Sequence, residues 1–163
     1  MAHPHTSEQP QAYEADETQL KDRLAFIDRY PNAARITRLS FSVSFTALAI
    51  GALLGIIQAL HRTNVLRGIV SSVDYYSVLT GHGVLLALFF TIFFLTGIFT
   101  WGTSKSLGRE LQSPRFSLAW FLLMLSGAVM TSTAIFGGLV GQIPFSADVL
   151  YTFYAPLQAH PLF

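Results

Sequence analysis

The sequence predicts an all-α membrane protein with three transmembrane helices and its N-terminus on the inner side of the membrane. The 163 residues are 52% apolar and only 12% charged, with a mean hydropathy of +0.47, whereas about a quarter of the residues in a soluble domain are charged. The apolar residues gather in three runs, each longer than the ~20 residues that cross a bilayer as a helix. The basic residues lie mostly on one side of this arrangement.

Residues 1–35 form a polar N-terminal tail. Residues 1–15 are expected to be disordered, because they are polar and carry few large apolar side chains. Residues 16–30 are expected to form a short helix at the membrane surface, since Leu20, Leu24 and Ile27 recur at helical spacing. Pro31 should end this helix. The apolar run that follows is too long for the core of a signal peptide.

The expected spans cover about residues 37–61, 75–103 and 116–141, and a fourth is expected to start near residue 160. Backbone polar groups cannot stay unpaired in lipid, so the spans must be helices. The second run is longer than one crossing needs and should tilt. Gly137, Gly138 and Pro144 favour an end of the third helix well before residue 147. Because the chain stops on an apolar turn, we expect it to be a piece of a longer protein.

The basic residues predict the orientation. Eight of the ten Lys and Arg residues lie in residues 1–38 or between the second and third spans, and two lie between the first and second. The richer side should face the cytoplasm. Trp101 and Trp120 then fall at the inner interface, and Tyr75 and Tyr151 near the outer one, as aromatic belts do.

His82 is the one histidine deep inside a predicted span, about two turns from its outer end. Ionisable residues in spans usually mark functional sites, and a buried imidazole needs partners for its nitrogens. Four interpretations remain open from the residues alone. His82 could bind a haem iron, bind another metal, relay protons, or form a hydrogen bond to a neighbouring helix.

Two neighbouring features favour a haem. Gly81 and Gly83 remove bulk beside the histidine, so a flat macrocycle could approach the backbone. At helical spacing the same face continues as Leu86, Phe89 and Phe93, which would form an apolar wall along a porphyrin. Ordinary packing in the protein core explains such a wall equally well.

The other histidines and the small-residue motifs give weaker evidence for a functional site. His61, His82 and His160 all fall toward the outer side, so a three-histidine metal site is conceivable, but their spacing is not that of a helical metal motif. His61 is expected to snorkel at the interface. His3 and His5 belong to the tail. Two small-residue motifs, Gly51 with Gly55 and Gly137 with Gly141, are interpreted as helix-packing seams.

Several chemistries are excluded by what the sequence lacks. There are no cysteines, which excludes disulfides and thiolate metal sites. The spans hold no acidic residue, and no phosphate-binding loop, activated serine or carboxylate pair is present. A net charge of +1 gives no signal for nucleic acid as a partner.

Two motifs carry a family resemblance. "LTGHGVLLALFF" resembles the second-helix motif of haem–copper oxidase subunit I, Leu-Thr-x-His-Gly. "VLYTFYAPL" resembles the family's Tyr-Pro-Pro-Leu segment before the fourth helix, with Ala155 in place of the first proline. The two motifs occur in order with one span between them, which is more specific than either alone. The tyrosine pair of "YYSVLTGHG" and the "VLYTFY" segment are most similar to the B-type cytochrome c oxidases. The resemblance covers residues 36–163.

The resemblance implies the first quarter of a twelve-helix bundle and a role for four residues. His82 would be an axial ligand of the low-spin haem, haem b, whose other ligand lies on a later helix. Gly81 and Gly83 would lie beside that haem, and Tyr151 near the active-site haem. Electrons would then reach a haem–copper centre, where dioxygen is reduced to water with proton translocation. The link between the second and third spans lacks the asparagine-rich loop of the A-type, which favours the B-type.

The resemblance also implies partners and a location. The partners are membrane lipid, the remaining helices of subunit I, a subunit II with an outer-side copper electron acceptor, and a cytochrome c or small copper protein as donor. The location is the plasma membrane of a prokaryote. The alternatives are a nitric oxide reductase or quinol oxidase of the same superfamily, and a haem-carrying membrane module without a catalytic centre. A di-haem cytochrome b is a weaker alternative, because it would need two pairs of deep histidines and His82 is the only deep one in the predicted spans.

Overall fold

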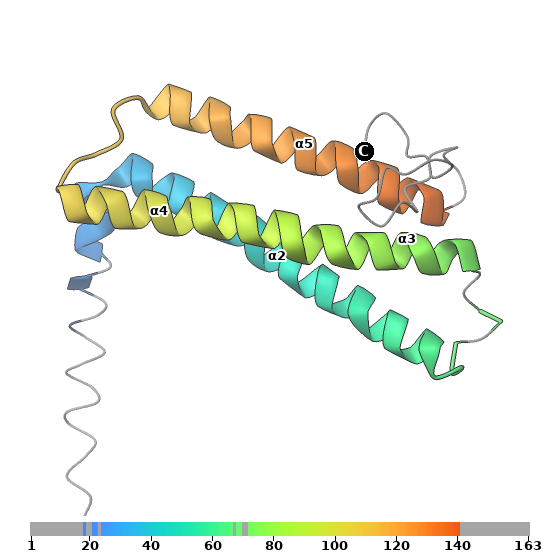
Figure 1. The fold of residues 1–163 in the computed structure, drawn as a ribbon. Helices are drawn as coiled ribbons and strands as arrows, with labels where there is room; N and C mark the ends of the chain where they lie inside the picture. The colour runs from blue at the N-terminus through green and yellow to red at the C-terminus, as the bar shows by residue number, and fades with distance from the viewer. Residues whose placement is uncertain (1–17, 19–20, 23, 67, 70–71, 141–163) are drawn as a thin grey trace, which may run out of the picture.

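In the part of the chain that the structure describes, the fold consists of three long helices, each antiparallel to the next along the chain (Figure 1). The computed structural model describes residues 18, 21–22, 24–66, 68–69 and 72–140. The first long helix is α2, Pro31–Arg62. The second is a continuous rod of α3, Ser72–Gly83, the π-helix η1, Val84–Phe90, and α4, Thr91–Leu107. The third is α5, Pro114–Val140. The predicted all-α class with three long apolar helices, which are candidate membrane spans, is confirmed for the described residues.

The helices are long and apolar enough to cross a membrane over Pro31–Arg62, Asp74–Leu107 and Pro114–Gly137. These segments cover the predicted spans 37–61, 75–103 and most of 116–141. α2 and α5 begin earlier than predicted because each starts with a proline, whose fixed φ suits the first helical position. The fourth helix predicted near residue 160 lies outside the described residues.

The short helix before α2 ends before Pro31, as predicted. Residues 24–29 are helical, and Tyr30, with φ −134°, separates them from α2. The short helix therefore ends just before Pro31. Its placement on a membrane surface stays a prediction, and the predicted disordered residues 1–15 lie outside the described part of the chain.

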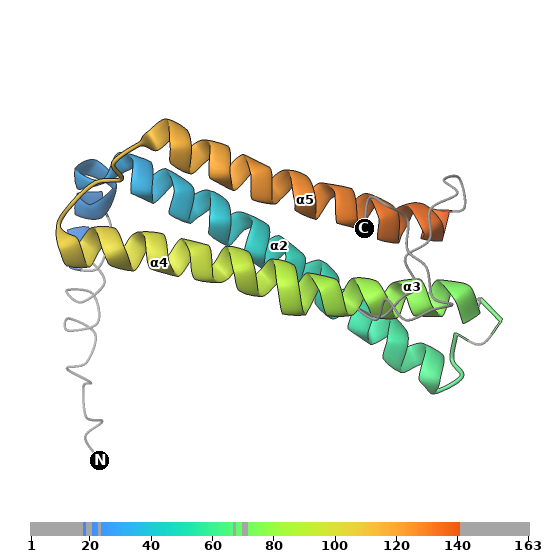
Figure 2. The same cartoon turned by 45° about the horizontal axis from the view of Figure 1, so that its top comes forward.

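Glu110, in the link between α4 and α5, closes the N-terminal end of α2. Its carboxylate accepts hydrogen bonds from the backbone N–H groups of Asn32 and Ala33, both at 3.0 Å. Those N–H groups have no partner inside the helix, and the positive end of the helix dipole favours an anion there. The contact holds the start of α2 and the end of α4 at the same end of the bundle (Figure 2).

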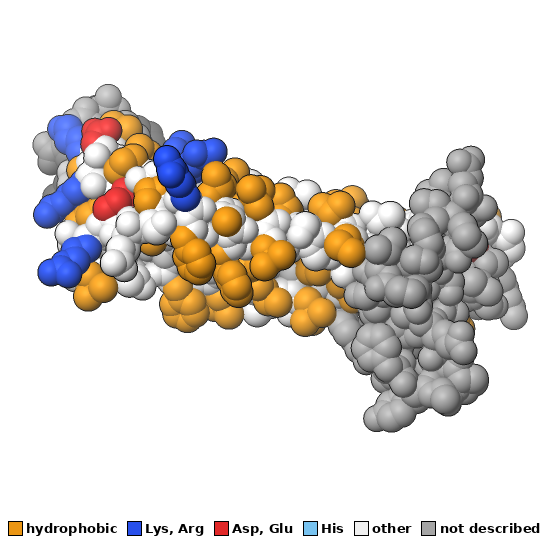
Figure 3. Space-filling model, turned by 90° about the horizontal axis from the view of Figure 1, so that it is seen from above, with side chains coloured by type: hydrophobic (Ala, Val, Ile, Leu, Met, Phe, Trp, Pro, Cys, Tyr) orange, Lys and Arg blue, Asp and Glu red, His pale blue; other side chains and the backbone are white. Residues whose placement is uncertain are grey.

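The charged and apolar surfaces are separated along the bundle. Lys and Arg side chains gather at one end, and hydrophobic side chains cover the middle (Figure 3). Many large apolar side chains are exposed there, among them Leu53, Phe99 and Leu123 at 60–65%. A surface of this kind suits lipid or further helices. The gathering of basic residues at one end agrees with the predicted orientation, which itself stays a prediction.

The core lies where α2 and α5 pack against the α3–η1–α4 rod. At the basic end Ile36, Phe93, Phe121 and Ala128 form one buried cluster. A second cluster of Ala47, Leu54, Val78 and Leu85 joins α2 to α3 and η1. Small residues predominate on the buried face of α2, which lets the helix backbones approach closely.

Candidate functional site

His82 lies in the last turn of α3, and its ring is held by α2. The Nδ1 atom is 2.7 Å from the carbonyl oxygen of Gly51. A carbonyl oxygen only accepts hydrogen bonds, so Nδ1 carries the hydrogen and donates it. In the neutral ring the lone pair then belongs to Nε2. Nε2 has no hydrogen-bond partner among the residues that the structure describes. The ring is half-buried and presents one nitrogen that can bind a metal.

Gly51 and Gly55 together make room for this ring. A Cβ atom at Gly55 would lie 2.9 Å from Cε1 and 3.1 Å from Nδ1 of His82. A Cβ atom at Gly51 would lie 2.7 Å from Leu86, so packing also contributes. The interpretation of this motif as a packing seam alone is therefore incomplete. The signal that could have shown its second role is the pair of glycines at the predicted depth of His82.

Close contacts with α2 and α5 account for a glycine at position 81. It is buried, and a Cβ atom there would lie 3.0 Å from Leu54 of α2 and 3.2 Å from Ile135 of α5. Gly83 is half-buried at the end of α3. Contact of either glycine with a cofactor stays a prediction, and Tyr151 lies outside the described residues.

The π-helix η1 changes which aromatic residues share the face of His82. Its i→i+5 hydrogen bonds turn the chain by less per residue than an α-helix does. Leu86 still meets α2 beside the histidine, at Gly51. Phe93, however, is 2% exposed and lies against Phe121 of α5, with 5.8 Å between ring centroids. The expectation that Phe93 continues the histidine face is therefore wrong.

The aromatic residue of the rod that lies close to aromatic rings of α2 is Phe94 rather than Phe93. The ring of Phe94 stacks on Phe90 at 5.3 Å. It lies 5.6 Å from Phe41 and 6.1 Å from Phe45 of α2. Phe89 packs against all three buried clusters instead. π-helical turns within α-helices are frequent at functional sites, and this one follows the histidine directly.

The imidazole lies on the side of α3 away from α5. Val84 packs with Ala134 and Ile135 of α5, and Gly81 contacts Ile135 as well. At about 100° per residue, His82 is turned roughly 100° from Gly81 and 200° from Val84. The contacts found for the ring among the described residues are with Gly51 and Gly55 of α2.

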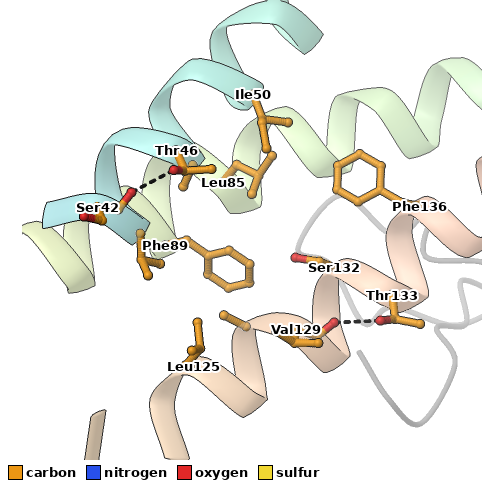
Figure 4. A pocket seen from close by; sticks show the side chains of 13 residues that line it. Ser42, Thr46, Ile50, Leu85, Phe89, Leu125, Val129, Ser132, Thr133 and Phe136 are labelled. Carbon is orange, nitrogen blue, oxygen red and sulfur yellow. Dashed lines mark hydrogen bonds between the residues drawn. The ribbon is translucent and has the colours of Figure 1, made fainter. Parts of the chain in front are cut away.

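The groove on the other side of the rod is separate from this site. It has a volume of about 560 Å³, lies between α2 and α5 over Leu85 and Phe89, and has no ionisable side chain in its lining (Figure 4). The hydroxyls of Thr46 and Thr133 donate to backbone carbonyls one turn back on their own helices, both at 2.8 Å. Among the described residues, the lining of this groove holds no imidazole, carboxylate or thiolate that could bind a metal ion.

His61 has a structural role at the far end of α2. Its ring stacks on Tyr75 with 4.6 Å between centroids, and Nε of Arg62 donates to the Tyr75 hydroxyl at 2.9 Å. These contacts join the end of α2 to the start of α3. The described part of the chain holds no group of three or more metal-ligating side chains. His3, His5 and His160 lie outside it, so the three-histidine site stays untested.

Comparison with known proteins agrees with these findings. Residues 35–163 match the family described as "Cytochrome C and Quinol oxidase polypeptide I". The chain is also similar to cytochrome c oxidase subunit 1 of Thermus thermophilus, with 32% identity over 142 residues. The match covers 82% of this chain and 23% of that relative. No solved structure matches the chain. With its three apolar helices, the chain is a multi-pass membrane segment that belongs to the cytochrome c and quinol oxidase polypeptide I family, haem–copper oxidase subunit I.

Proposed function

We propose that this chain is the segment of a B-type cytochrome c oxidase subunit I in which His82 binds the iron of the low-spin haem, haem b. One observation carries the proposal: the hydrogen bond from Nδ1 to Gly51 leaves the Nε2 lone pair without a hydrogen-bond partner among the described residues. The family binds haems and copper, and the matched residues include His82. The name of the Thermus thermophilus relative supports cytochrome c rather than quinol as the source of electrons.

The residues of this chain would hold and orient the haem in two ways. Nε2 of His82 would bind the iron, and the other protein ligand would come from outside the described residues. The Gly51 carbonyl fixes the ring orientation and raises the basicity of the ligand, as second-shell acceptors do for metal-bound histidines. A haem iron with two imidazole ligands is saturated and carries single electrons rather than binding dioxygen.

The wider role follows from the same proposal. In the complete protein, electrons from a cytochrome c or small copper protein would pass through subunit II and the low-spin haem to a haem–copper centre that reduces dioxygen to water with proton translocation. Tyr151 would lie near the active-site haem. The complete protein would be in a prokaryotic plasma membrane. A quinol oxidase is the second candidate, because the description of the matched family names both kinds of polypeptide.

The test is His82→Ala in the complete subunit I, assembled with its partners. We expect the low-spin haem absorption bands to disappear while the protein still inserts in the membrane. The matched control is His61→Ala, which removes a histidine stacked on Tyr75 and should leave the bands unchanged. Unchanged bands in the His82 variant would refute the ligand assignment. Turnover with reduced cytochrome c, compared with turnover with a quinol, separates the two candidate oxidases.

A further inference from the structure

A second cavity opens at the basic end of the bundle and contains both charged and aromatic side chains. It has a volume of about 400 Å³ and lies between the helical residues before Pro31, the start of α2 and the end of α4. Its lining includes two cations, Arg38 and Lys105, and the aromatic rings of Phe26, Phe41 and Trp101. This cavity plays no part in holding His82.

The two cations mark the border of the apolar bundle on their helices. Arg38 is the last charged residue of α2 before an uncharged stretch that continues to His61. Lys105 is the first charged residue after the uncharged stretch that begins beyond Asp74. Side chains at such a border lie at the level of lipid headgroups, and Trp101 is of the type enriched there. Phe41 lies one turn further into the bundle than Thr37, which also lines the cavity.

Both cations are free to bind an anion. Arg38 is exposed, its Nε donates to the carbonyl oxygen of Ala34 at 3.4 Å, and its terminal guanidinium nitrogens form no hydrogen bond to the described residues. Nζ of Lys105 lies 5.3 Å from the centre of the Trp101 ring. Neither side chain forms an ion pair with a carboxylate of the described residues. Asp22, also exposed, shares the cavity, so the lining carries a net charge of +1 (two cations minus one acid).

An aromatic surface continues from the cavity toward the middle of the membrane. The ring of Phe26 lies 6.5 Å from Trp101 at the headgroup level. Deeper along α2, Phe41 lies 6.1 Å from Phe45 and 5.6 Å from Phe94 of the facing rod. Phe45 is 53% exposed. The cavity would therefore suit the negatively charged head of a lipid, and the aromatic surface would suit its long apolar chain.

We propose that this cavity binds an anionic phospholipid from the leaflet at the basic end of the bundle. The guanidinium of Arg38 and the ammonium of Lys105 bind the phosphate, and an acyl chain lies over Phe41, Phe45 and Phe94. Guanidinium groups form paired hydrogen bonds with phosphate oxygens, and cations near a membrane surface bind anionic lipids in preference to zwitterionic ones. The proposal does not depend on the identity of the haem ligand.

The test compares lipid binding to the complete, purified oxidase by native mass spectrometry. The probes are phosphatidylglycerol and phosphatidylcholine with the same acyl chains. We expect the wild-type protein to prefer phosphatidylglycerol on the order of tenfold, and the double variant Arg38→Ala with Lys105→Ala to show no preference. Arg109→Ala is the matched control, because Arg109 is an exposed cation at the same end that does not line this cavity. It should keep the preference.

A charge-preserving variant and two competition experiments distinguish the possible causes of a lost preference. The charge-preserving variant Arg38→Lys with Lys105→Arg should retain the preference, which separates loss of charge from loss of folding. Inorganic phosphate at millimolar concentration, or phosphatidylglycerol with short chains, should not compete with the long-chain lipid. Effective competition by phosphate, an equal loss in Arg109→Ala, or a preference that emerges only after removal of a partner subunit would overturn the proposal. The last outcome would assign the cavity to that subunit.

Discussion

The hydrogen bond from Nδ1 of His82 to the carbonyl oxygen of Gly51, at 2.7 Å, joins residues 31 positions apart in the chain. The donor lies in the last turn of α3 and the acceptor lies in α2. A backbone carbonyl cannot rotate away as a side chain can, so the orientation of the ring depends on the distance between two helices. The candidate ligand is therefore sensitive to any residue that pushes these helices or the ring apart.

Gly55→Ala tests this dependence. The new methyl group would lie 2.9 Å from Cε1 of His82, which is closer than side-chain atoms pack, so the ring must tilt or lose its hydrogen bond. We expect a shifted or weakened low-spin haem spectrum in the complete protein, measured by optical absorption and electron paramagnetic resonance. This should occur even though alanine suits a helix better than glycine by ~1 kcal/mol.

Gly102→Ala is the control for that experiment. Gly102 lies in α4 with no atom within 4 Å of a Cβ built on it. The variant should leave the spectrum unchanged and keep or slightly raise the thermal stability. If Gly55→Ala behaved in the same way as Gly102→Ala, the close contact between α2 and the imidazole would not limit the site.

Gly81→Ala separates helix packing from contact with a macrocycle. The added methyl group would crowd Leu54 and Ile135 at 3.0 and 3.2 Å, and overpacking of this kind costs about 1–3 kcal/mol. We expect a lower temperature of thermal unfolding and an unchanged haem spectrum, with Gly127→Ala, which meets open space, as the control. The reverse result, an altered spectrum at unchanged stability, would favour the cofactor contact expected from the sequence.

Glu110→Ala should destabilise the start of α2. The variant removes the acceptor of the Asn32 and Ala33 N–H groups and leaves these donors without their partner. Loss of such a cap and of its charge costs about 1–2 kcal/mol. Thermal unfolding and hydrogen exchange of those two amides measure the effect. Glu110→Gln keeps an acceptor oxygen but removes the charge, and it should lose less than Glu110→Ala. Equal losses in both variants would show that the charge, rather than a neutral acceptor, stabilises this end of α2.

Ser40→Ala and Ser44→Ala should not destabilise the protein. Both hydroxyl groups are fully buried against the rod and have no hydrogen-bond partner among the described residues. Removing a buried hydroxyl without a partner should raise the free energy of unfolding by about 1 kcal/mol. Ser42→Ala is the comparison, because the exposed Ser42 hydroxyl donates to the Arg38 carbonyl at 2.9 Å and its loss should have little effect. A clear loss of stability in either buried variant would show that its hydroxyl has a partner in the complete protein.

The three long apolar helices of the described residues could be predicted from the residue order. Such helices depend on local requirements: a stretch of apolar residues as long as the hydrocarbon core is thick, and a backbone that pairs its own polar groups. The starts of α2 and α5 at Pro31 and Pro114 show where that prediction was incomplete. The prolines break the preceding chain but suit the first turn of the next helix.

His82 could also be identified as a candidate site residue from the sequence, because an ionisable ring in an apolar run stands out without any structure. The residues that surround the His82 ring could not be predicted from the sequence. Periodicity of 3.6 residues assigned Phe93 to the histidine face, whereas η1 shifts the register and turns Phe93 toward α5. Only the packing of α2 against α3 brings Gly51 and Gly55 to the imidazole. Such a contact depends on the rotation and distance of two helices, and hydropathy, which records only how apolar each stretch is, contains neither quantity.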